Sequence, residues 1–359
     1  MKVPFFSLKY TNQLIREDLE KIFSRSDEFI LVGGGEVAIF EKQFAEYVHT
    51  KNAVSCGNGT DALEIVLRAL NINSADEVIV PALTCFATVE AIVNAGAKPI
   101  FVDVDERSFT LDPTLLYSAI TPHTKAIIPV HLYGGSADIE SILRIANGIP
   151  VIEDCSHAHG LLIGEHPVGS QSTAGIFSFY PTKNLGAMGD AGIIVTQNNK
   201  LADRCRTIAN HGQKGKDHHL FSGKNSRMDT LQAAILSAKI KHLSYLNSER
   251  RKNAEQYYSQ LSSDIKVPLK NTNHVYHQFV IQVERREELI KYLDEKGIGT
   301  AIHYPYAVNT YKFFYKDQPI KACPVAEGLI KNILSLPIYP GINPEQINYV
   351  TQEINNFYP

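Results

Sequence analysis

Lys183 is the residue whose type and setting most clearly favour covalent chemistry. It lies in GIFSFYPTKNLGAMGDAGIIV (residues 175–195), just after an apolar run and before a glycine-rich turn. A lysine amine becomes a nucleophile toward carbonyl groups once its surroundings lower its pKa. The segment therefore predicts a lysine that bonds to an aldehyde or ketone, and a solvated loop lysine is the alternative.

A second segment, SCGNGTDALEIVL (residues 55–67), combines a strand, a glycine-containing turn and a helix. Gly57, Gly59 and Ala62 match the dinucleotide pattern G-x-G-x-x-A, and a plain strand-to-helix turn is the other interpretation. The backbone amides of Gly59 and Thr60 open the helix, and a helix N-terminus attracts anions. The segment predicts a site for a phosphate group of some kind.

Asp154 is the third residue that could do chemistry. In PVIEDCSHAHG (residues 150–160) it falls where a buried parallel strand should end, and open α/β sheets bind ligands at that edge. Its carboxylate could bind a metal, pair with a cationic ligand group or cap a helix. His157 and His159, with Glu153, could form a metal cluster, but no HExxH or facial-triad spacing supports one. We therefore expect no metal site.

These three signals become one site if the ligand is pyridoxal phosphate. That cofactor needs a lysine for its aldehyde, an anion cradle for its phosphate and a carboxylate that keeps its ring nitrogen protonated. Lys183, the Gly59–Thr60 turn and Asp154 supply these groups. A dinucleotide enzyme has no use for the lysine or for the carboxylate, so the dinucleotide interpretation is disfavoured.

The elements that must position these residues alternate between strands and helices. The strand candidates are short, apolar runs that lack strict alternation, which is typical of strands buried on both faces. They are residues 53–56, 77–82, 99–104, 126–133, 150–154, 174–180 and 191–196. Amphipathic stretches at 61–70 and 87–96 lie between them. This alternation predicts an α/β fold with a mainly parallel, seven-stranded sheet.

After about residue 230 the pattern changes to a smaller α+β unit. We expect a helical stretch at 228–261 with a break near Leu246–Asn247, and a solvated basic face at Arg250–Lys252. The further elements expected are a strand at 275–283, a helix at 285–297, a strand at 299–305 and a last helix from Pro344. The sequence thus predicts a large domain at 1–240 and a small C-terminal domain at 241–359.

Composition excludes several classes of protein. The 359 residues carry a formal net charge of −3, without the basic excess typical of a nucleic-acid binder. No stretch reaches the ~18 apolar residues of a membrane helix, and the N-terminus lacks a secretory signal. The five cysteines are odd in number and widely spaced, which favours reduced thiols. We expect a cytoplasmic enzyme that binds neither nucleic acid nor membrane.

Nearly the whole chain resembles the DegT/StrS-type sugar-nucleotide aminotransferases. The shared motifs include FILVGGGEVAIFEKQFAEYV (29–48), GNGTDAL, VPALTCFATVEAI, FVDVD, EDCSHAHG, SFYPTKNLGAMGDAG, GKNSRMDTLQAAIL (223–236), HYP (303–305) and LSLPIYPG (334–341). The resemblance implies the aspartate-aminotransferase fold, fold type I, and pyridoxal 5'-phosphate as cofactor. Lys183 would hold the cofactor and move protons, and Asp154 would pair with its ring nitrogen. The residues implied to bind its phosphate are Gly59, Thr60 and Ser178.

The resemblance also implies that the site is shared between subunits. Asn225 matches an asparagine that reaches the cofactor phosphate of the neighbouring subunit, so a homodimer is expected. Arg227 is a candidate for binding an anionic group of the amino donor or of the sugar nucleotide. His303 and Tyr304, from the smaller domain, are expected in the wall of the substrate site.

Two positions depart from the family pattern. Where the family has an aromatic residue or histidine on the cofactor ring, this chain has Cys85 followed by Phe86, and either could cover the ring. Where glutamine is common, near the cofactor hydroxyl, it has His157, whose protonation would make activity pH-sensitive.

The implied reaction moves an amino group from glutamate or glutamine to a keto sugar linked to a nucleoside diphosphate. Lys183 favours transamination, because relatives that eliminate a sugar hydroxyl have histidine there. The turn NLGAMGDAG, with Asp190, resembles members that aminate C-3 of 3-keto-6-deoxyhexoses or of related uronic acids. The alternatives are a C-4 keto sugar, a cyclitol ketone, and a regulator that binds pyridoxal phosphate without turnover.

Overall fold

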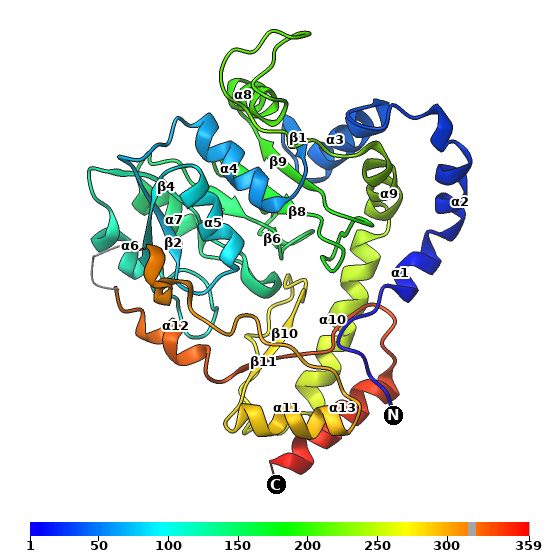
Figure 1. The fold of residues 1–359 in the computed structure, drawn as a ribbon. Coiled ribbons are helices and arrows are strands. Elements are labelled where there is room, and N and C mark those ends of the chain that lie inside the picture. Colours follow the sequence, from blue (N-terminus) through cyan, green and yellow to red (C-terminus); the bar gives the residue numbers. More distant parts are fainter. Residues whose placement is uncertain (315–320, 359) are drawn as a thin grey trace.

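A seven-stranded sheet forms the centre of the larger part of the fold, as seen in the computed structural model, which describes residues 1–314 and 321–358 (Figure 1). Its strands are β1 (Asn52–Cys56), β2 (Glu77–Pro81), β3 (Lys98–Val102), β4 (Thr124–Ile127), β5 (Ile152–Asp154), β8 (Ala174–Ser178) and β9 (Gly192–Thr196).

The sheet is mainly parallel, as predicted. Hydrogen-bonded strands run in the orders β3-β2-β4 and β5-β8-β9-β1, and parallel bridges from Ile127 to Val151 and from Val130 to Asp154 join the two groups. Strand β9 is antiparallel to both β8 and β1, while β2 pairs in parallel with β3 and β4, and β5 with β8. The expected fold class is therefore confirmed.

Helices cover both faces of this sheet. They are α3 (Gly35–Tyr47), α4 (Gly59–Ala69), α5 (Phe86–Asn94), α6 (Pro113–Ala119), α7 (Ile139–Ala146), α8 (Asn199–Ala209) and α9 (Thr230–Ile240). Successive residues of β8 enter different cores: Ile176 packs into the core that includes α4 and α8, and Phe177 into the core that includes α3 and α9. Because both faces are buried, the strands are continuous apolar runs.

The smaller part packs its helices around a two-stranded antiparallel sheet (Figure 1). It contains α10 (Leu243–Gln260), β10 (Phe279–Gln282), α11 (Arg286–Glu295), β11 (Ile333–Leu336) and α13 (Pro344–Phe357). Helix α12 (Pro324–Leu329) lies between β10 and β11 in the chain, but its Ala326 and Leu329 pack into the core of the larger part. The N-terminus joins this part, because Val3 bridges to Ile298 and lies in the same apolar core. The expected domain division near residue 240 stays a prediction.

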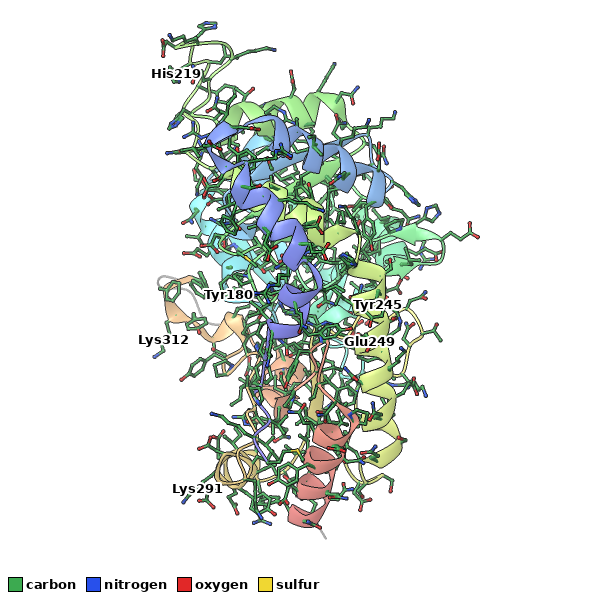
Figure 2. All side chains as sticks on the ribbon, turned by 90° about the vertical axis from the view of Figure 1, so that its right-hand side faces the viewer. Tyr180, His219, Tyr245, Glu249, Lys291 and Lys312 are labelled. Atoms are coloured by element: carbon green, nitrogen blue, oxygen red, sulfur yellow. The ribbon has the colours of Figure 1, made fainter. Side chains whose placement is uncertain are left out.

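The remaining short elements lie mostly at the surface. They are α1 (Lys9–Leu14), α2 (Arg16–Ser24), β6 (Leu162–Ile163), β7 (His166–Pro167) and the 3-10 turns Ser26–Glu28, Leu132–Gly134, Val308–Thr310 and Lys312–Phe314. The loop that carries His219 projects beyond the body of the molecule (Figure 2). No helix within the described ranges has both the length and the apolar character required to cross a bilayer.

Two expected elements of the smaller part are placed differently. The helical break lies between α9 and α10, at Lys241–His242, because Leu246 and Asn247 are both buried and α10 runs through them. The segment 299–305 forms no strand and makes only one bridge, from Ala301 to Ser335. Its later residues leave the sheet and line a cavity, described below.

Arg250 was expected on a solvated face, and this expectation is wrong. The side chain is 3% exposed, and its guanidinium donates to the carbonyl oxygens of Tyr276 and Ile338. Carbonyl acceptors replace water for this cation, although burial still lowers the pKa of Arg250 to about 9. It thereby ties α10 to the segments around β10 and β11.

Candidate active site

A cavity of about 610 Å³ opens at the carboxyl ends of the parallel strands. It brings together Lys183, Asp154, Gly59 and Thr60, which the sequence places as much as 124 residues apart, counted from Gly59 to Lys183. The smaller part of the fold closes one side. The residues that it contributes are His277, Gln278, His303 and Tyr304.

Lys183 closes a turn in the long segment that joins β8 to β9. Its backbone N–H donates to the carbonyl oxygen of Tyr180. The buried Lys239 fixes the same segment, because its Nζ donates to the carbonyl oxygen of Gly186 at 2.7 Å. Removal from water lowers the pKa of Lys183 to about 8, against the opposing influence of Cys85 and Asp154. About a tenth of its amine is therefore neutral and nucleophilic at pH 7, far more than for a lysine in water.

Asp154 ends β5 and is held by two donors. The hydroxyl of Thr88 donates to Oδ2 at 3.0 Å, and the N–H of Ser156 donates to Oδ1 at 3.1 Å. Thr84 lies 3.0 Å from Thr88, so a buried pair of hydroxyl groups supports the carboxylate. The sequence analysis missed this pair. Its signal is the four-residue spacing across the start of α5, which places both hydroxyls on one side.

The first turn of α4 and the end of β8 form a close-fitting cradle. Asn58 caps the helix by accepting from the N–H of Asp61 at 2.8 Å, which leaves the N–H groups of Gly59 and Thr60 in the turn where a helix has no internal acceptors. A Cβ added at Gly59 would lie 2.7 Å from the Cβ of Ser178. Only glycine allows this approach, so the amides and the Ser178 hydroxyl can surround an anion.

His157 lines the cavity as a neutral side chain. Its Nδ1 accepts a hydrogen bond from the backbone N–H of Tyr133 at 3.3 Å, which leaves the proton on Nε2. The centroids of the His157 and His277 rings lie 4.4 Å apart. Burial, with the nearby charge of Lys183, holds the pKa of His157 well below its usual value. The expected pH sensitivity through protonation of His157 is therefore not supported by its surroundings.

Cys85 and Phe86 point in different directions. Cys85 lines the cavity, whereas Phe86 packs against Tyr311 and Phe314 with ring centroids 5.4 and 5.8 Å apart. Cys85 and Tyr304 are thus the neighbours available to a ring bound in the cavity. Burial, with the nearby Cys85, raises the pKa of Tyr304 well above its usual value.

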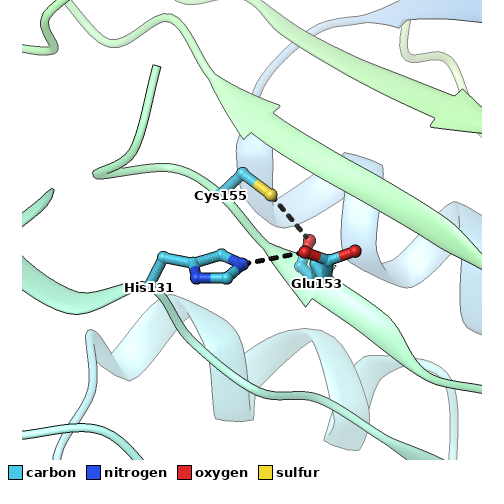
Figure 3. A group of neighbouring side chains, drawn as sticks. All are labelled: His131, Glu153 and Cys155. Carbon is cyan, nitrogen blue, oxygen red and sulfur yellow. Dashed lines mark hydrogen bonds and ion pairs between the residues drawn. The ribbon is translucent and has the colours of Figure 1, made fainter. Parts of the chain in front are cut away.

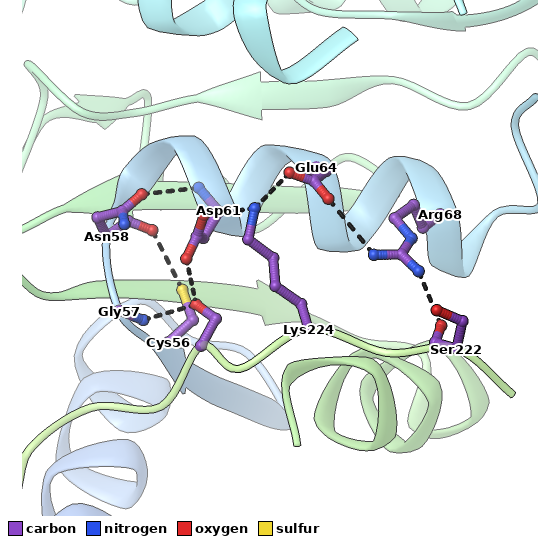
Figure 4. Close-up of polar contacts among 9 residues, drawn as sticks. Cys56, Gly57, Asn58, Asp61, Glu64, Arg68, Ser222 and Lys224 are labelled. Carbon is purple, nitrogen blue, oxygen red and sulfur yellow. Dashed lines mark hydrogen bonds and ion pairs between the residues drawn. The ribbon is translucent and has the colours of Figure 1, made fainter. Parts of the chain in front are cut away.

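Asn225 and Arg227 lie outside the cavity of their own chain. Both are exposed, and the Arg227 guanidinium donates to Asn225 Oδ1 at 2.6 Å. Figure 4 shows how the segment is fixed to α4. Lys224 Nζ lies 2.8 Å from Asp61 and 2.5 Å from Glu64. Side chains on this fixed segment can reach a site other than the one in their own chain.

His131, Glu153 and Cys155 form a buried polar group, and the last two flank Asp154 in the chain (Figure 3). Its ligand atoms lie within 4.8 Å of one another, but both ring nitrogens of His131 have partners. Nε2 lies 2.9 Å from Glu153, and Nδ1 accepts from the N–H of Ala137. Burial alone would raise the pKa of Glu153, but its hydrogen bond to His131, with further bonds from Ser172 and Gly169, holds the pKa below the usual value. The group fixes β5 against the end of β4.

The residues of the large cavity fit pyridoxal phosphate. The cradle at Gly59 matches a phosphate, and the half-buried amine of Lys183 matches an aldehyde. Asp154 offers a buried carboxylate to a protonated ring nitrogen. Which residue performs which role remains our proposal.

Comparison with known proteins agrees with this arrangement. Residues 12–355 match the DegT/DnrJ/EryC1/StrS aminotransferase family. The chain is 42% identical to a "pleiotropic regulatory protein" of Geobacillus stearothermophilus, covering 100% of this chain and 99% of the relative. It is 43% identical to a UDP-N-acetyl-3-dehydro-alpha-D-glucosamine 3-aminotransferase of Acidithiobacillus ferrooxidans, covering 89% and 88%.

A solved structure of S. venezuelae DesV, in complex with a ketimine intermediate, superimposes with a TM-score of 0.95. The two chains are 38% identical, and the match covers 99% of this chain and 98% of DesV. The matched span, the shared fold and the cavity that Lys183 lines all indicate the same family. The chain belongs to the DegT/DnrJ/EryC1/StrS aminotransferase family and is a pyridoxal-phosphate-dependent transaminase.

Proposed function

We propose that this transaminase moves the amino group of glutamate to C-3 of a keto sugar linked to a nucleoside diphosphate. The observation that carries the proposal is the single cavity that joins Lys183, Asp154 and the first turn of α4. Support for C-3 comes from a relative at 43% identity whose name specifies a 3-dehydro sugar and its 3-amination. The turn with Asp190, which also lines the cavity, favours the same carbon.

The reaction has two halves that balance. In the first, glutamate gives up its amino group and its Cα proton, a water molecule supplies the keto oxygen, and 2-oxoglutarate leaves. In the second, the sugar ketone receives the amino group and a proton at C-3, and its oxygen leaves as water. Bound pyridoxal phosphate supplies the electron sink for the carbanion and carries the amino group between halves.

Lys183 performs the proton transfers in this proposal. Its Nζ would hold the cofactor aldehyde, and once free it would take the proton from the donor Cα. In the second half the same Nζ returns a proton to C-3 of the sugar. The pKa of about 8 suits both tasks, because the amine accepts and releases protons near the working pH.

Other side chains orient the reactants. Asp154, held by Thr88 and Ser156, keeps the ring nitrogen protonated, and the neutral Nε2–H of His157 donates to the ring hydroxyl. His303 and Tyr304 form the wall on the sugar side. The smaller part of the fold thus contributes to substrate binding as well as to closure of the site.

We further propose that two copies of the chain form a dimer that shares its sites. Ile30, Leu31 and Ile39 are 70%, 72% and 49% exposed, which is unusual for a group of neighbouring aliphatic side chains. The patch adjoins the segment of Asn225, because the N–H of Thr230 donates to the carbonyl of Leu31. A second copy on this patch would receive Asn225 and Arg227 near its own cavity.

A regulatory role is the second candidate, since one relative at 42% identity is named a regulatory protein. The two candidates differ in turnover. A regulator without turnover would keep its cofactor in the aldehyde form with every donor, whereas a transaminase converts it to the amine form.

Visible absorbance of the purified protein tests the proposal. The wild type, loaded with pyridoxal phosphate, should be yellow and should bleach on addition of glutamate, while Lys183→Ala should not turn over. Nucleoside-diphosphate 3-amino and 4-amino sugars, supplied with 2-oxoglutarate, then test the carbon. If the protein bleaches with neither glutamate nor glutamine, the donor assignment is overturned. If 4-amino sugars react faster than 3-amino sugars, the assignment of C-3 is overturned.

A further inference from the structure

A second cavity, of about 230 Å³, adjoins the active site. We call it the annex. It shares five lining residues with the active-site cavity: Tyr180, Thr182, His277, Gln278 and His303. Its remaining walls are apolar and consist of Phe5, Phe6 and Ile338. Because the shared residues belong to both cavities, a substrate bound at Lys183 can extend into the annex.

The N-terminal segment builds one wall of the annex and is fixed in place. The N–H of Val3 donates to the carbonyl of Gly297 at 2.9 Å, and the N–H of Gly299 donates to the carbonyl of Val3 at 2.8 Å. A Cβ added at Gly299 would lie 2.6 Å from the nitrogen of Phe5, so glycine permits the close approach. The wall is therefore a built feature of the fold.

The ring of Phe5 stacks on that of His303, with centroids 5.8 Å apart and planes inclined by 26°. His303 also lines the active-site cavity, and its Nδ1 lies 2.9 Å from the hydroxyl of Ser335 in β11. The annex wall is thus in direct contact with a side chain of the substrate site.

The annex lacks a countercharge for an anion. Within residues 1–314 and 321–358, no Lys, Arg, Asp or Glu lines it. Burial holds the pKa of His277 well below its usual value and lowers that of His303 to about 4, so both rings are neutral near pH 7. Thr182 and Gln278 can offer hydrogen bonds. A carboxylate or phosphate entering the annex would therefore lose water without gaining an ion pair.

We propose that the annex binds the edge of the sugar that carries C-5, that it accepts an uncharged methyl group there, as in a 6-deoxyhexose, and that it rejects the carboxylate of a uronic acid. This inference rests on the proposed function, because it names the class of keto sugar that the same site accepts. The apolar walls of Phe5, Phe6 and Ile338 favour the methyl group by removing it from water.

The nucleotide end of the substrate does not fit the same place. A nucleobase is joined to the sugar through a diphosphate, which would have to pass along walls without a cation. The diphosphate is better matched by the exposed guanidinium of Arg227, contributed by the second copy. The annex is consequently assigned to the sugar ring.

The first experiment compares two nucleoside-diphosphate 3-amino sugars that share the nucleotide and differ only at C-5, one with methyl and one with carboxylate. Each is given to the holoenzyme with 2-oxoglutarate, and kcat/KM is measured from the release of glutamate. We expect kcat/KM for the methyl sugar to be about 100-fold higher, because the carboxylate would be bound without a partner of opposite charge. Equal rates, or a preference for the carboxylate, would overturn the proposal.

Variants of Phe5 test whether the annex is the part of the site that discriminates between the two sugars. Phe5→Lys supplies a cation and should reduce the preference for the methyl sugar by about tenfold or more. Phe5→Leu keeps the wall apolar and should retain most of the preference. Phe313→Leu, which alters an exposed phenylalanine that lines neither cavity, is the control and should leave the ratio unchanged. An unchanged ratio in Phe5→Lys would overturn the assignment.

The test separates this inference from the proposed function. If the wild type reacts with glutamate and with both sugars equally, the annex proposal fails and the transaminase proposal stands. If it reacts with glutamate but with neither sugar, the annex proposal fails as well, because the methyl sugar is not accepted, and the transaminase assignment stands.

Discussion

Burial controls the protonation of the side chains around Lys183. The surrounding protein removes water from the Lys183 amine and from the rings of His157 and His277, and each of these groups becomes easier to hold in its neutral form. Neutral histidines keep fixed donor and acceptor atoms, and a neutral lysine can attack a carbonyl. Both effects can therefore be tested by varying the pH.

The rate at which the apoprotein takes up pyridoxal phosphate should follow deprotonation of Lys183. Only the neutral amine attacks the aldehyde, so the rate should rise about tenfold per pH unit below pH 8 and level off above it. Stopped-flow absorbance of the bound cofactor measures this rate. A rate that keeps rising to pH 10.5 would show that the lysine behaves as it does in water.

His157→Gln should leave the pH profile of turnover unchanged between pH 5.5 and 7.5. In the wild type His157 is already neutral in this range, since burial lowers its pKa and its Nδ1 accepts from Tyr133. Glutamine offers a comparable donor, so we expect kcat/KM within about threefold of wild type. A wild-type activity that falls below pH 6.5, and is restored in the variant, would contradict this.

At the scale of elements, the start of α4 decides whether a phosphate can approach. Helix α4 follows β1 at a glycine, and β8 ends at Ser178 directly against it. The segment of Lys224 and Ser226 also fixes the start of α4, because the Ser226 hydroxyl donates to the carboxylate of Asp61 at 2.6 Å. The cradle thus depends on three elements that are remote in sequence.

Gly59→Ala should weaken binding of pyridoxal phosphate about tenfold, although alanine favours a helix by about 1 kcal/mol over glycine. The added Cβ would lie 2.7 Å from that of Ser178 and would push the cradle open. Equilibrium titration of the apoprotein measures the affinity. Gly328→Ala is the matched control, because Gly328 also lies in a helix, α12, and an added Cβ there would meet no atom within 4 Å. Equal affinity in both variants would argue against the cradle.

For the whole molecule, our proposal is that one chain leaves its own site incomplete. Asn225 and Arg227 are exposed outside the cavity, and aliphatic side chains beside them are exposed as well. Both observations are explained if a second copy covers the patch and receives these side chains.

Mixing two defective variants tests this arrangement. Lys183→Ala and Asn225→Ala, each impaired alone, should regain about a quarter of wild-type activity after dissociation and reassociation, because half of the dimers then contain one intact site. Turnover at limiting cofactor is the readout. A mixture of Lys183→Ala with Asp154→Asn should regain nothing, since both residues belong to one chain's cavity. Absence of recovery in the first mixture would contradict the shared site.

Local pattern determined much of the fold and part of the site. The strand runs were recognisable because both faces of the sheet are buried, and Lys183, Asp154 and Gly59 stood out because each follows or ends such a run. These features depend on neighbours within a few residues. A sequence expresses such short-range relations directly, through periodicity and turn chemistry.

Only the tertiary structure decided which distant residues meet. It separated Cys85 from Phe86, buried Arg250 among carbonyl groups, and placed Phe5 against His303, nearly three hundred positions away in the chain. No local pattern carries these contacts, because they depend on how whole elements pack and on which backbone carbonyls are left to accept a charge. The annex, built from both ends of the chain, therefore became visible only in the folded molecule.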